Sequence, residues 1–153
     1  MKLAGKIAIV TGGGSGIGHQ TARLFAKNGA TVLVADRNGE VATRVAEELA
    51  AIGARAEAMT VDVASETDIE AMVARCVAAH GRLDVLVNNA GYGIAGTVVN
   101  TAVEDWDALF AVNVRGVYLG CKHAIPVMER QGGGVIVNTA SGGAIVGIYD
   151  RAA

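Results

Sequence analysis

A glycine-rich segment, Thr11–Gly18 (Thr-Gly-Gly-Gly-Ser-Gly-Ile-Gly), is the clearest candidate for chemistry in this chain. It follows a short apolar run and precedes a helical pattern, so it predicts a strand-to-helix turn. Glycine tolerates positive φ and lets a ligand or a second backbone come close. The start of a helix offers unpaired N–H groups and a positive dipole end, which together bind anions. A tight turn without a ligand would also explain the glycines.

This segment can be compared with two phosphate-binding motifs. A Walker A loop requires Gly-x-x-x-x-Gly-Lys-Ser/Thr, and Gly13 and Gly18 have that spacing. His19 and Gln20 follow instead of the lysine and the hydroxyl residue, which disfavours ATP hydrolysis. The dinucleotide fingerprint Gly-x-Gly-x-x-Gly is not matched in any register. Thr-Gly-x-x-x-Gly-x-Gly is a longer turn that can serve the same pyrophosphate role, and we expect a solvated structural role for His19.

An acidic residue stands where a dinucleotide site needs one. Asp36 ends the second apolar run, 18 residues after Gly18, close to the spacing of about 20 at which an acid binds the ribose 2′-hydroxyl. A carboxylate accepts hydrogen bonds from ribose hydroxyls and repels a 2′-phosphate, which favours NAD over NADP. Arg37 follows directly and could pair with a 2′-phosphate, so NADP stays open.

Short apolar runs alternate with helical patterns along the whole chain. Strands are expected at 6–11, 31–35, 56–61, 83–87 and 135–139, and helices at 17–28, 40–52, 65–79 and 104–130. Asn28-Gly29 and Gly53 are expected to end the first two helices, and Ser65 to cap the third. This alternation requires right-handed crossovers and a parallel sheet. We therefore expect a doubly wound α/β sheet of the Rossmann type, with no domain boundary inside residues 1–153.

The helical patterns also predict which side chains face the sheet. Apolar residues recur at helical spacing in the first two helices: Ile17, Ala22, Leu24 and Phe25, then Val41, Val45, Leu49 and Ile52. In the long fourth helix Asn113 interrupts an apolar pattern, and a buried amide there must find hydrogen-bond partners. Cys76 and Cys121 lie in apolar helical patterns without a metal-ligand spacing, so we interpret both as small core residues.

Five features in register resemble the short-chain dehydrogenase/reductase family. They are Thr11-Gly12-x-x-x-Gly16-x-Gly18, Asp62-Val63 after the third strand, Asn88-Asn89-Ala90-Gly91, Asn113, and Ser141 after the fifth strand. The resemblance implies hydride transfer between a nicotinamide and a carbonyl or alcohol carbon of a small molecule. It also implies a homo-oligomer, dimer or tetramer, for the intact protein.

The resemblance assigns roles to particular residues. By similarity, Asp62 would bind the adenine amino group, Val63 would contact the adenine, and Asn89, Ala90 and Gly91 would line the cofactor. Asn113 would hold a water in a proton relay, and Ser141 would bind the substrate oxygen and stabilise its developing charge. The remaining expected cofactor contacts lie in the glycine turn and at the end of the second strand: Gly12, Gly14, Ser15, Gly16, Ile17, Gly18, Asp36 and Arg37.

The family's acid/base, a tyrosine in a Tyr-x-x-x-Lys motif, is not found at its usual distance from Ser141. Tyr149 would need a lysine at position 153, where Ala153 stands, and it lies too close to Ser141. Measured from Ser141, the tyrosine would directly follow Ala153. We therefore expect the N-terminal part of a longer single-domain oxidoreductase, inactive as these 153 residues alone, with Tyr149 in a loop or substrate pocket.

Composition excludes several other classes. Charged residues make up 18% of the chain, which argues against disorder. A net charge of −2 with mixed signs gives no basic stripe for nucleic acid. There is no signal-peptide pattern at the start and no apolar run near the ~20 residues that span a bilayer. We expect a cytoplasmic protein with no metal site.

Two alternatives to a dehydrogenase stay open at this point. One is a truncated, non-catalytic dinucleotide-binding module that is complete at Ala153. The fifth strand argues against it, because that strand would become an apolar sheet edge, which natural proteins usually cover. The other is a methyltransferase-like Rossmann domain, which the Asn88–Gly91 segment, Asn113 and Ser141 disfavour.

Overall fold

Five parallel strands form one sheet in the computed structural model, which describes residues 1–146 and 148. The strand order is β3-β2-β1-β4-β5. The strands are β1 (Ile7–Thr11), β2 (Thr31–Asp36), β3 (Ala56–Thr60), β4 (Val85–Asn88) and β5 (Val135–Asn138). Every pair of neighbours is parallel. The chain reverses its direction of winding between β1 and β4, which is where open α/β sheets bind ligands.

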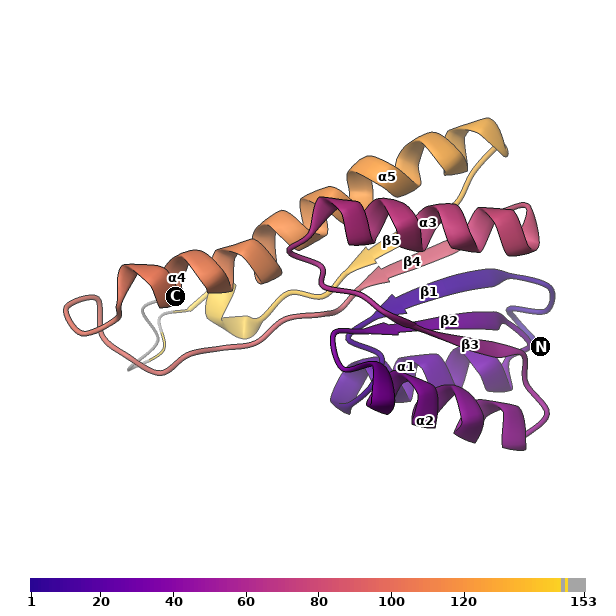
Figure 1. Cartoon of the computed structure of the whole chain (residues 1–153), viewed down its shortest axis with the longest axis horizontal. Helices are drawn as coiled ribbons and strands as arrows, with labels where there is room; N and C mark the ends of the chain where they lie inside the picture. The colour runs from indigo at the N-terminus through magenta and orange to yellow at the C-terminus, as the bar shows by residue number, and fades with distance from the viewer. Residues whose placement is uncertain (147, 149–153) are drawn as a thin grey trace.

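Helices cover both faces of this sheet (Figure 1). On one face lie α1 (Gly16–Lys27) and α2 (Gly39–Ala51); on the other lie α3 (Glu66–His80) and α5 (Gly116–Arg130). Each face has its own apolar core, one with Val10, Val34 and Leu49 and the other with Ile9, Ile69 and Leu86. The expected doubly wound parallel sheet is confirmed.

The predicted helix ends are confirmed. Ser65 caps α3, because its side chain accepts a hydrogen bond from the Asp68 amide. Gly29 and Gly53, at φ +91° and +81°, follow the ends of α1 and α2. These left-handed positions suit glycine, so the turn residues that the sequence shows are those that the backbone requires.

The apolar faces of the first two helices were predicted less well. Ile17 and Leu24 on α1 and Ile52 at the end of α2 are exposed. Helix α1 buries Ala22 of the expected stripe and, in addition, Gly18 and Ala26. Small residues let the helix backbone lie close to the sheet, so large apolar residues on its flanks stay outside the contact.

The helix expected at 104–130 is interrupted at its centre. Helix α4 (Val103–Phe110) runs into a π-helical turn, Ala111–Arg115, which continues as α5. A π-turn inserts an extra residue into the helix and changes which side chains share a face. Asn113, the polar residue that interrupts the apolar pattern, stands in the middle of this turn.

Asp84 is a buried carboxylate at the edge of the sheet where the strands begin, and no sequence pattern indicated it. Asp84 accepts hydrogen bonds from the Ile7 amide at 2.9 Å and from Arg82 Nη2 at 2.6 Å. Burial opposes its ionisation, but the bonds from Arg82 and Ile7 and the charges of Arg82 and Lys6 outweigh burial and hold the pKa of Asp84 below its usual value. This ion-pair group ties β1 to the start of β4.

The two cysteines differ. Cys76 lies in the core, and burial raises the pKa of its thiol to about 12. Cys121 is only half-buried and lies 3.9 Å from Asn88 Nδ2, so its prediction as a core residue is wrong in part. Tyr149, for which a loop or pocket position was expected, lies outside the described residues.

Candidate functional site

The carboxyl ends of all five strands meet at one edge of the sheet, on the side from which α4 projects (Figure 1). The predicted site residues follow these strand ends: the glycine turn follows β1, Asp36 ends β2, Asp62 follows β3, and Asn89–Gly91 follow β4. Ser141 follows β5. The topology therefore gathers at this edge residues that are far apart in the sequence.

The glycine turn is packed so tightly that side chains would not fit at several positions. Gly12 has a φ of +62° and Gly16 a φ of +52°. A Cβ on Gly18 would lie 2.1 Å from the Gly12 carbonyl oxygen and 2.5 Å from Asn89 Nδ2. At Gly14 it would lie 2.8 Å from Asp36 Oδ2. These glycines bring the turn against β2 and against the segment that follows β4.

The N-terminus of α1 has no internal compensation for its free N–H groups. Ser15 makes no side-chain cap, and no acidic residue lies in the first turn. By contrast, Asn38 caps α2 with Glu40 in the first turn, and Ser65 caps α3 with Glu66 and Asp68. The start of α1 therefore keeps the positive dipole end and the open donors that favour an anion.

Asp36 lies directly beside the glycine turn. Its Oδ2 accepts a hydrogen bond from the Gly14 amide at 3.0 Å, and its Oδ1 accepts one from the Asn38 amide at 3.0 Å. The carboxylate therefore fixes both the turn and the start of α2, while it remains half-buried at the edge. Arg37, next along the chain, is exposed.

His19 contributes a contact rather than only a solvated surface. Its Nε2 lies 2.8 Å from Glu48 Oε2 and so links the first turn of α1 to α2. The expected structural role fits this contact, but the side chain is more enclosed than a solvated one.

Thr11 is the junction between the glycine turn and the segment after β4, a role that sequence reasoning did not assign. Its hydroxyl donates to the Val87 carbonyl and accepts from the amides of Asn89 and Ala90, at 3.0 and 3.1 Å. Asn89 Nδ2 donates back to the Thr11 carbonyl at 3.0 Å. The partners lie 76 to 79 residues from Thr11 in the sequence, so no local pattern indicates this contact. The one available signal is a polar residue, the threonine, at the end of an apolar strand.

The segment after β3 is held from two sides. Asp62 Oδ1 accepts from the Ala64 amide at 2.9 Å, and the Asp62 side chain is exposed at the edge. Val63 is buried against Gly116, where an added Cβ would lie 3.0 Å from Val63 Cγ2. The two residues therefore form a turn in which an exposed carboxylate, bonded through one oxygen, stands next to a buried apolar side chain.

Asn113 binds the backbone of Tyr92 with both ends of its amide. Its Nδ2 donates to the Tyr92 carbonyl at 2.8 Å, and its Oδ1 accepts from the Tyr92 amide at 3.1 Å. The expected partners of this amide are thus found, although the side chain is half-buried rather than fully buried. Asn113 holds the segment after β4 against the π-turn.

Ser141 is exposed, and its hydroxyl accepts a hydrogen bond from the Gly143 amide at 3.2 Å. It begins a short 3₁₀ turn, Gly142–Ala144. A serine as turn former is the ordinary interpretation of this geometry, and the hydroxyl remains open to a ligand from the solvent side.

The sequence and the structure of this chain match a known family. Residues 6–153 match the family described as short chain dehydrogenase. The chain belongs to the short-chain dehydrogenase family. An uncharacterised oxidoreductase of Thermotoga maritima is 43% identical over 151 residues, 99% of this chain and 59% of that protein.

Solved structures of short-chain dehydrogenases superpose closely on this chain. A metagenomic short-chain oxidoreductase in complex with NADP has a TM-score of 0.94 at 37% identity, covering 99% of this chain and 69% of that one. A 7α-hydroxysteroid dehydrogenase complexed with NADH and 7-oxo glycochenodeoxycholic acid has a TM-score of 0.93 at 35% identity, covering 97% and 58%. This chain thus spans about three-fifths of the length of the relatives that it matches.

A Tyr-x-x-x-Lys spacing does occur within this short-chain dehydrogenase chain, at Tyr118 and Lys122. Lys122 Nζ lies 2.5 Å from Glu66 Oε1, and this hydrogen bond raises the pKa of the lysine. Tyr118 is 61% exposed on α5. Lys122 is therefore engaged in joining α5 to α3, and the pair is not the acid/base at the strand ends.

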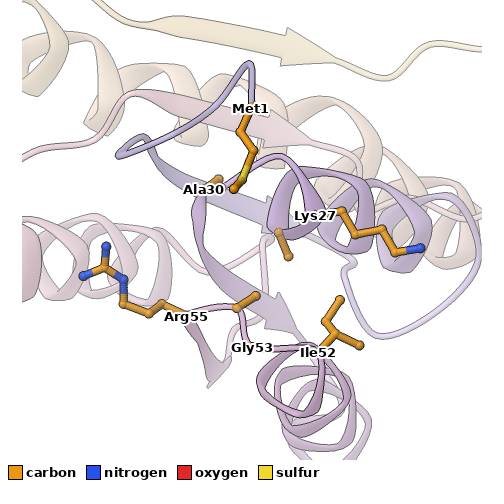
Figure 2. Close-up of a pocket in the computed structure, with 9 residues that line it drawn as sticks. Met1, Lys27, Ala30, Ile52, Gly53 and Arg55 are labelled. Atoms are coloured by element: carbon orange, nitrogen blue, oxygen red, sulfur yellow. The ribbon is translucent and has the colours of Figure 1, made fainter.

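One depression of the described part of the chain lies away from the strand ends. The turns that end α1 and α2 form its walls, with Met1 and Arg55 at its rim (Figure 2). Lys27 and Arg55 extend from different walls and do not converge. Its described lining contains no carboxylate, hydroxyl, thiol or imidazole.

Within residues 1–146 and 148, no helix is long and apolar enough to cross a membrane. Over the same residues, no three His, Cys, Asp or Glu side chains come together in a way that could hold a metal ion.

Proposed function

We propose that residues 1–153 form the dinucleotide-binding part of a single-domain NAD-dependent oxidoreductase. The observation that carries the proposal is the start of α1, which has neither a side-chain cap nor an acidic first turn and continues directly from the glycine turn. Gly12, Ser15, Gly16, Ile17 and Gly18 would hold the pyrophosphate through backbone N–H groups. Gly14, whose amide binds Asp36, would let the backbone lie close to it. When bound, the nicotinamide would exchange a hydride with a carbonyl or alcohol carbon of a small molecule.

The preference for NAD rests on Asp36. Its carboxylate has free lone pairs for two ribose hydroxyls even while it binds the Gly14 and Asn38 amides. A 2′-phosphate placed there would meet a fixed negative charge. Arg37 is exposed and could rotate toward a 2′-phosphate. We therefore expect NAD to bind more tightly than NADP, but not exclusively.

The other predicted site residues are assigned roles from their positions at the strand ends. Asp62 would accept from the adenine amino group and Val63 would contact the adenine through its backbone, while Asn89, Ala90 and Gly91 would border the nicotinamide ribose. Asn113 would orient a water for proton transfer, and Ser141 would hydrogen-bond the substrate oxygen. These roles are supported by position at the strand ends and by family membership.

Catalysis by the 153 residues alone is expected to be negligible. A positioned acid/base contributes roughly 10²–10⁴ to the rate, and the only Tyr-x-x-x-Lys spacing in the sequence is Tyr118–Lys122, whose lysine binds Glu66. A preparation of verified 153-residue mass should therefore bind dinucleotide without steady turnover of carbonyl substrates. Steady turnover by that preparation would contradict this part of the proposal.

Association into oligomers is proposed for the intact protein. Large apolar side chains are exposed along α4, the π-turn and α5, and they recur every three to seven residues: Val103, Trp106, Phe110, Val114, Tyr118 and Ile125. An apolar stripe of this kind on a helix is typical of a contact surface.

The binding proposal is tested by calorimetric titration of NAD, NADP and S-adenosylmethionine into the chain. We expect NAD to bind more tightly than NADP, and S-adenosylmethionine not to bind. Gly18→Ala should weaken NAD at least about tenfold, because a Cβ there collides with the Gly12 carbonyl. Gly93→Ala is the matched control, since no atom lies within 4 Å of a Cβ at Gly93.

A second variant tests the preference for NAD. Asp36→Asn keeps an oxygen acceptor for the Gly14 amide but removes the charge. The ratio of NADP to NAD dissociation constants should fall by about tenfold. Binding of S-adenosylmethionine without either dinucleotide would reject the dehydrogenase proposal altogether.

A further inference from the structure

The π-turn Ala111–Arg115 contacts the segment after β3 on one side and the segment after β4 on the other. Arg115 Nη2 donates to the Ala64 carbonyl at 3.0 Å, across 51 residues of sequence. Asn113, two residues earlier, binds the Tyr92 backbone twice. One short turn therefore fixes two segments that come from different strands.

The contact at Ala64 leads directly to Asp62. The Ala64 amide donates to Asp62 Oδ1 at 2.9 Å, so the residue that accepts from Arg115 also orients the Asp62 carboxylate. Gly116 follows Arg115 and packs on Val63, where a Cβ would lie 3.2 Å from the Val63 carbonyl oxygen. The lack of a side chain at position 116 therefore lets the π-turn lie close to Val63.

We propose that Arg115 is a positioning residue, which holds the Asp62–Ala64 segment for adenine and links that segment, through the π-turn, to the Tyr92 backbone. The inference rests on the proposed function, because that function places adenine at Asp62 and Val63. It adds that an occupied adenine site should stabilise the segment after β4, although no adenine contact is expected there.

A π-turn suits such a link. Asn113 and Arg115 lie two residues apart in this one turn, so the contacts of both side chains depend on the same short stretch of backbone. Arg115 is a better choice than lysine for a backbone carbonyl at the surface, since its planar group loses less freedom per hydrogen bond.

The test uses the 153-residue chain with 5′-AMP as the probe for the adenine end and nicotinamide mononucleotide as the probe for the other end. Arg115→Met should weaken AMP binding by about fivefold, as expected for a lost charged hydrogen bond at the surface. Binding of nicotinamide mononucleotide should stay unchanged. Arg115→Lys should recover part of the AMP affinity, and Arg130→Met, on the exposed last turn of the same helix, is the control.

Hydrogen exchange at the Tyr92 amide supplies a readout that a merely structural role would not change. AMP should slow this exchange in the unaltered chain and should fail to slow it in Arg115→Met, with circular dichroism confirming that the variant is folded. Unaltered AMP affinity in Arg115→Met, or no effect of AMP on Tyr92 in the unaltered chain, would overturn the proposal. If the unaltered chain binds neither AMP nor NAD, the proposed function fails and this inference fails with it.

Discussion

Strands β4 and β5 have almost the same sequence but very different environments. The two read Val85-Leu86-Val87-Asn88 and Val135-Ile136-Val137-Asn138, and they pair residue by residue in parallel. All four residues of β4 are buried, whereas three of the four in β5 are exposed. Val135 and Val137 are 56% and 46% exposed. Nearly identical residue types thus predict a strand without predicting what covers it.

The difference has a geometric cause. Val85 and Val87 belong to the core on the side of α1 and α2, and Leu86 belongs to the core on the side of α3 and α5. Residues in register share a face, so Val135 and Val137 also face the side of α1 and α2. These helices lie over β1, β2 and β3 and do not extend to β5. Ile136 faces the other side and packs on that core.

The strongest test of this comparison places a charge in both strands. Val87→Lys should unfold the chain, because a buried ammonium without a partner costs more than about 4 kcal/mol. Val137→Lys, at the equivalent position of β5, should change the free energy of unfolding by less than about 0.5 kcal/mol. Urea denaturation followed by circular dichroism measures both. Unfolding by both lysines would show that β5 is covered in solution.

Truncation of the central residue gives a smaller contrast. Leu86→Ala should lower the free energy of unfolding by about 3 kcal/mol, because Leu86 is fully buried and a cavity remains. Ile136→Ala should cost about 1 kcal/mol, since Ile136 is packed on one side only. The same urea titrations measure both changes. Equal decreases in the free energy of unfolding for the two variants would contradict the one-sided packing of β5.

The sequence predicted the periodic parts of the fold and the parts of the site that are local in the chain. The strands, the helix ends at Ser65 and Gly29, and the placement of Asp36 at the end of β2 all follow from short-range patterns. The junction at Thr11 and the binding of Tyr92 by Asn113 could not be predicted, because their partners lie 76 to 79 and 21 residues away. The exposure of β5 could not be predicted for the same reason, because it depends on α1 and α2, which do not extend over β5.

The residues that precede the two strands sharpen the comparison. Asp84 before β4 is buried and bonded to Arg82 and Ile7, while Gly134 before β5 is exposed. Asp84→Asn should lower the free energy of unfolding by about 2 kcal/mol at pH 7, since the amide cannot pair with Arg82 as a charge. Asp107→Asn, at an exposed position on α4, should have no effect.

The pH dependence of the Asp84 effect has a definite sign. Because the folded-state pKa is held below the unfolded value of about 3.9, ionised Asp84 stabilises the fold above that value. This stabilisation is lost as the pH falls through the lower, folded-state pKa. The difference between the unaltered chain and Asp84→Asn should therefore be constant from pH 6 to 7 and shrink below about pH 4. A difference that grew in acid would refute the assignment.

The smallest expected effect lies at the last pair of the two strands. Asn88 is buried and donates from Nδ2 to Asn138 Oδ1 at 2.9 Å, whereas Asn138 is exposed. Asn138→Ala should cost about 1 kcal/mol, because water can reach the freed Asn88 amide from the open side of β5. Asn138→Asp retains the acceptor and is the control. A loss above about 3 kcal/mol for Asn138→Ala would mean that water does not reach Asn88, and that β5 is covered at its carboxyl end even though its valines are exposed.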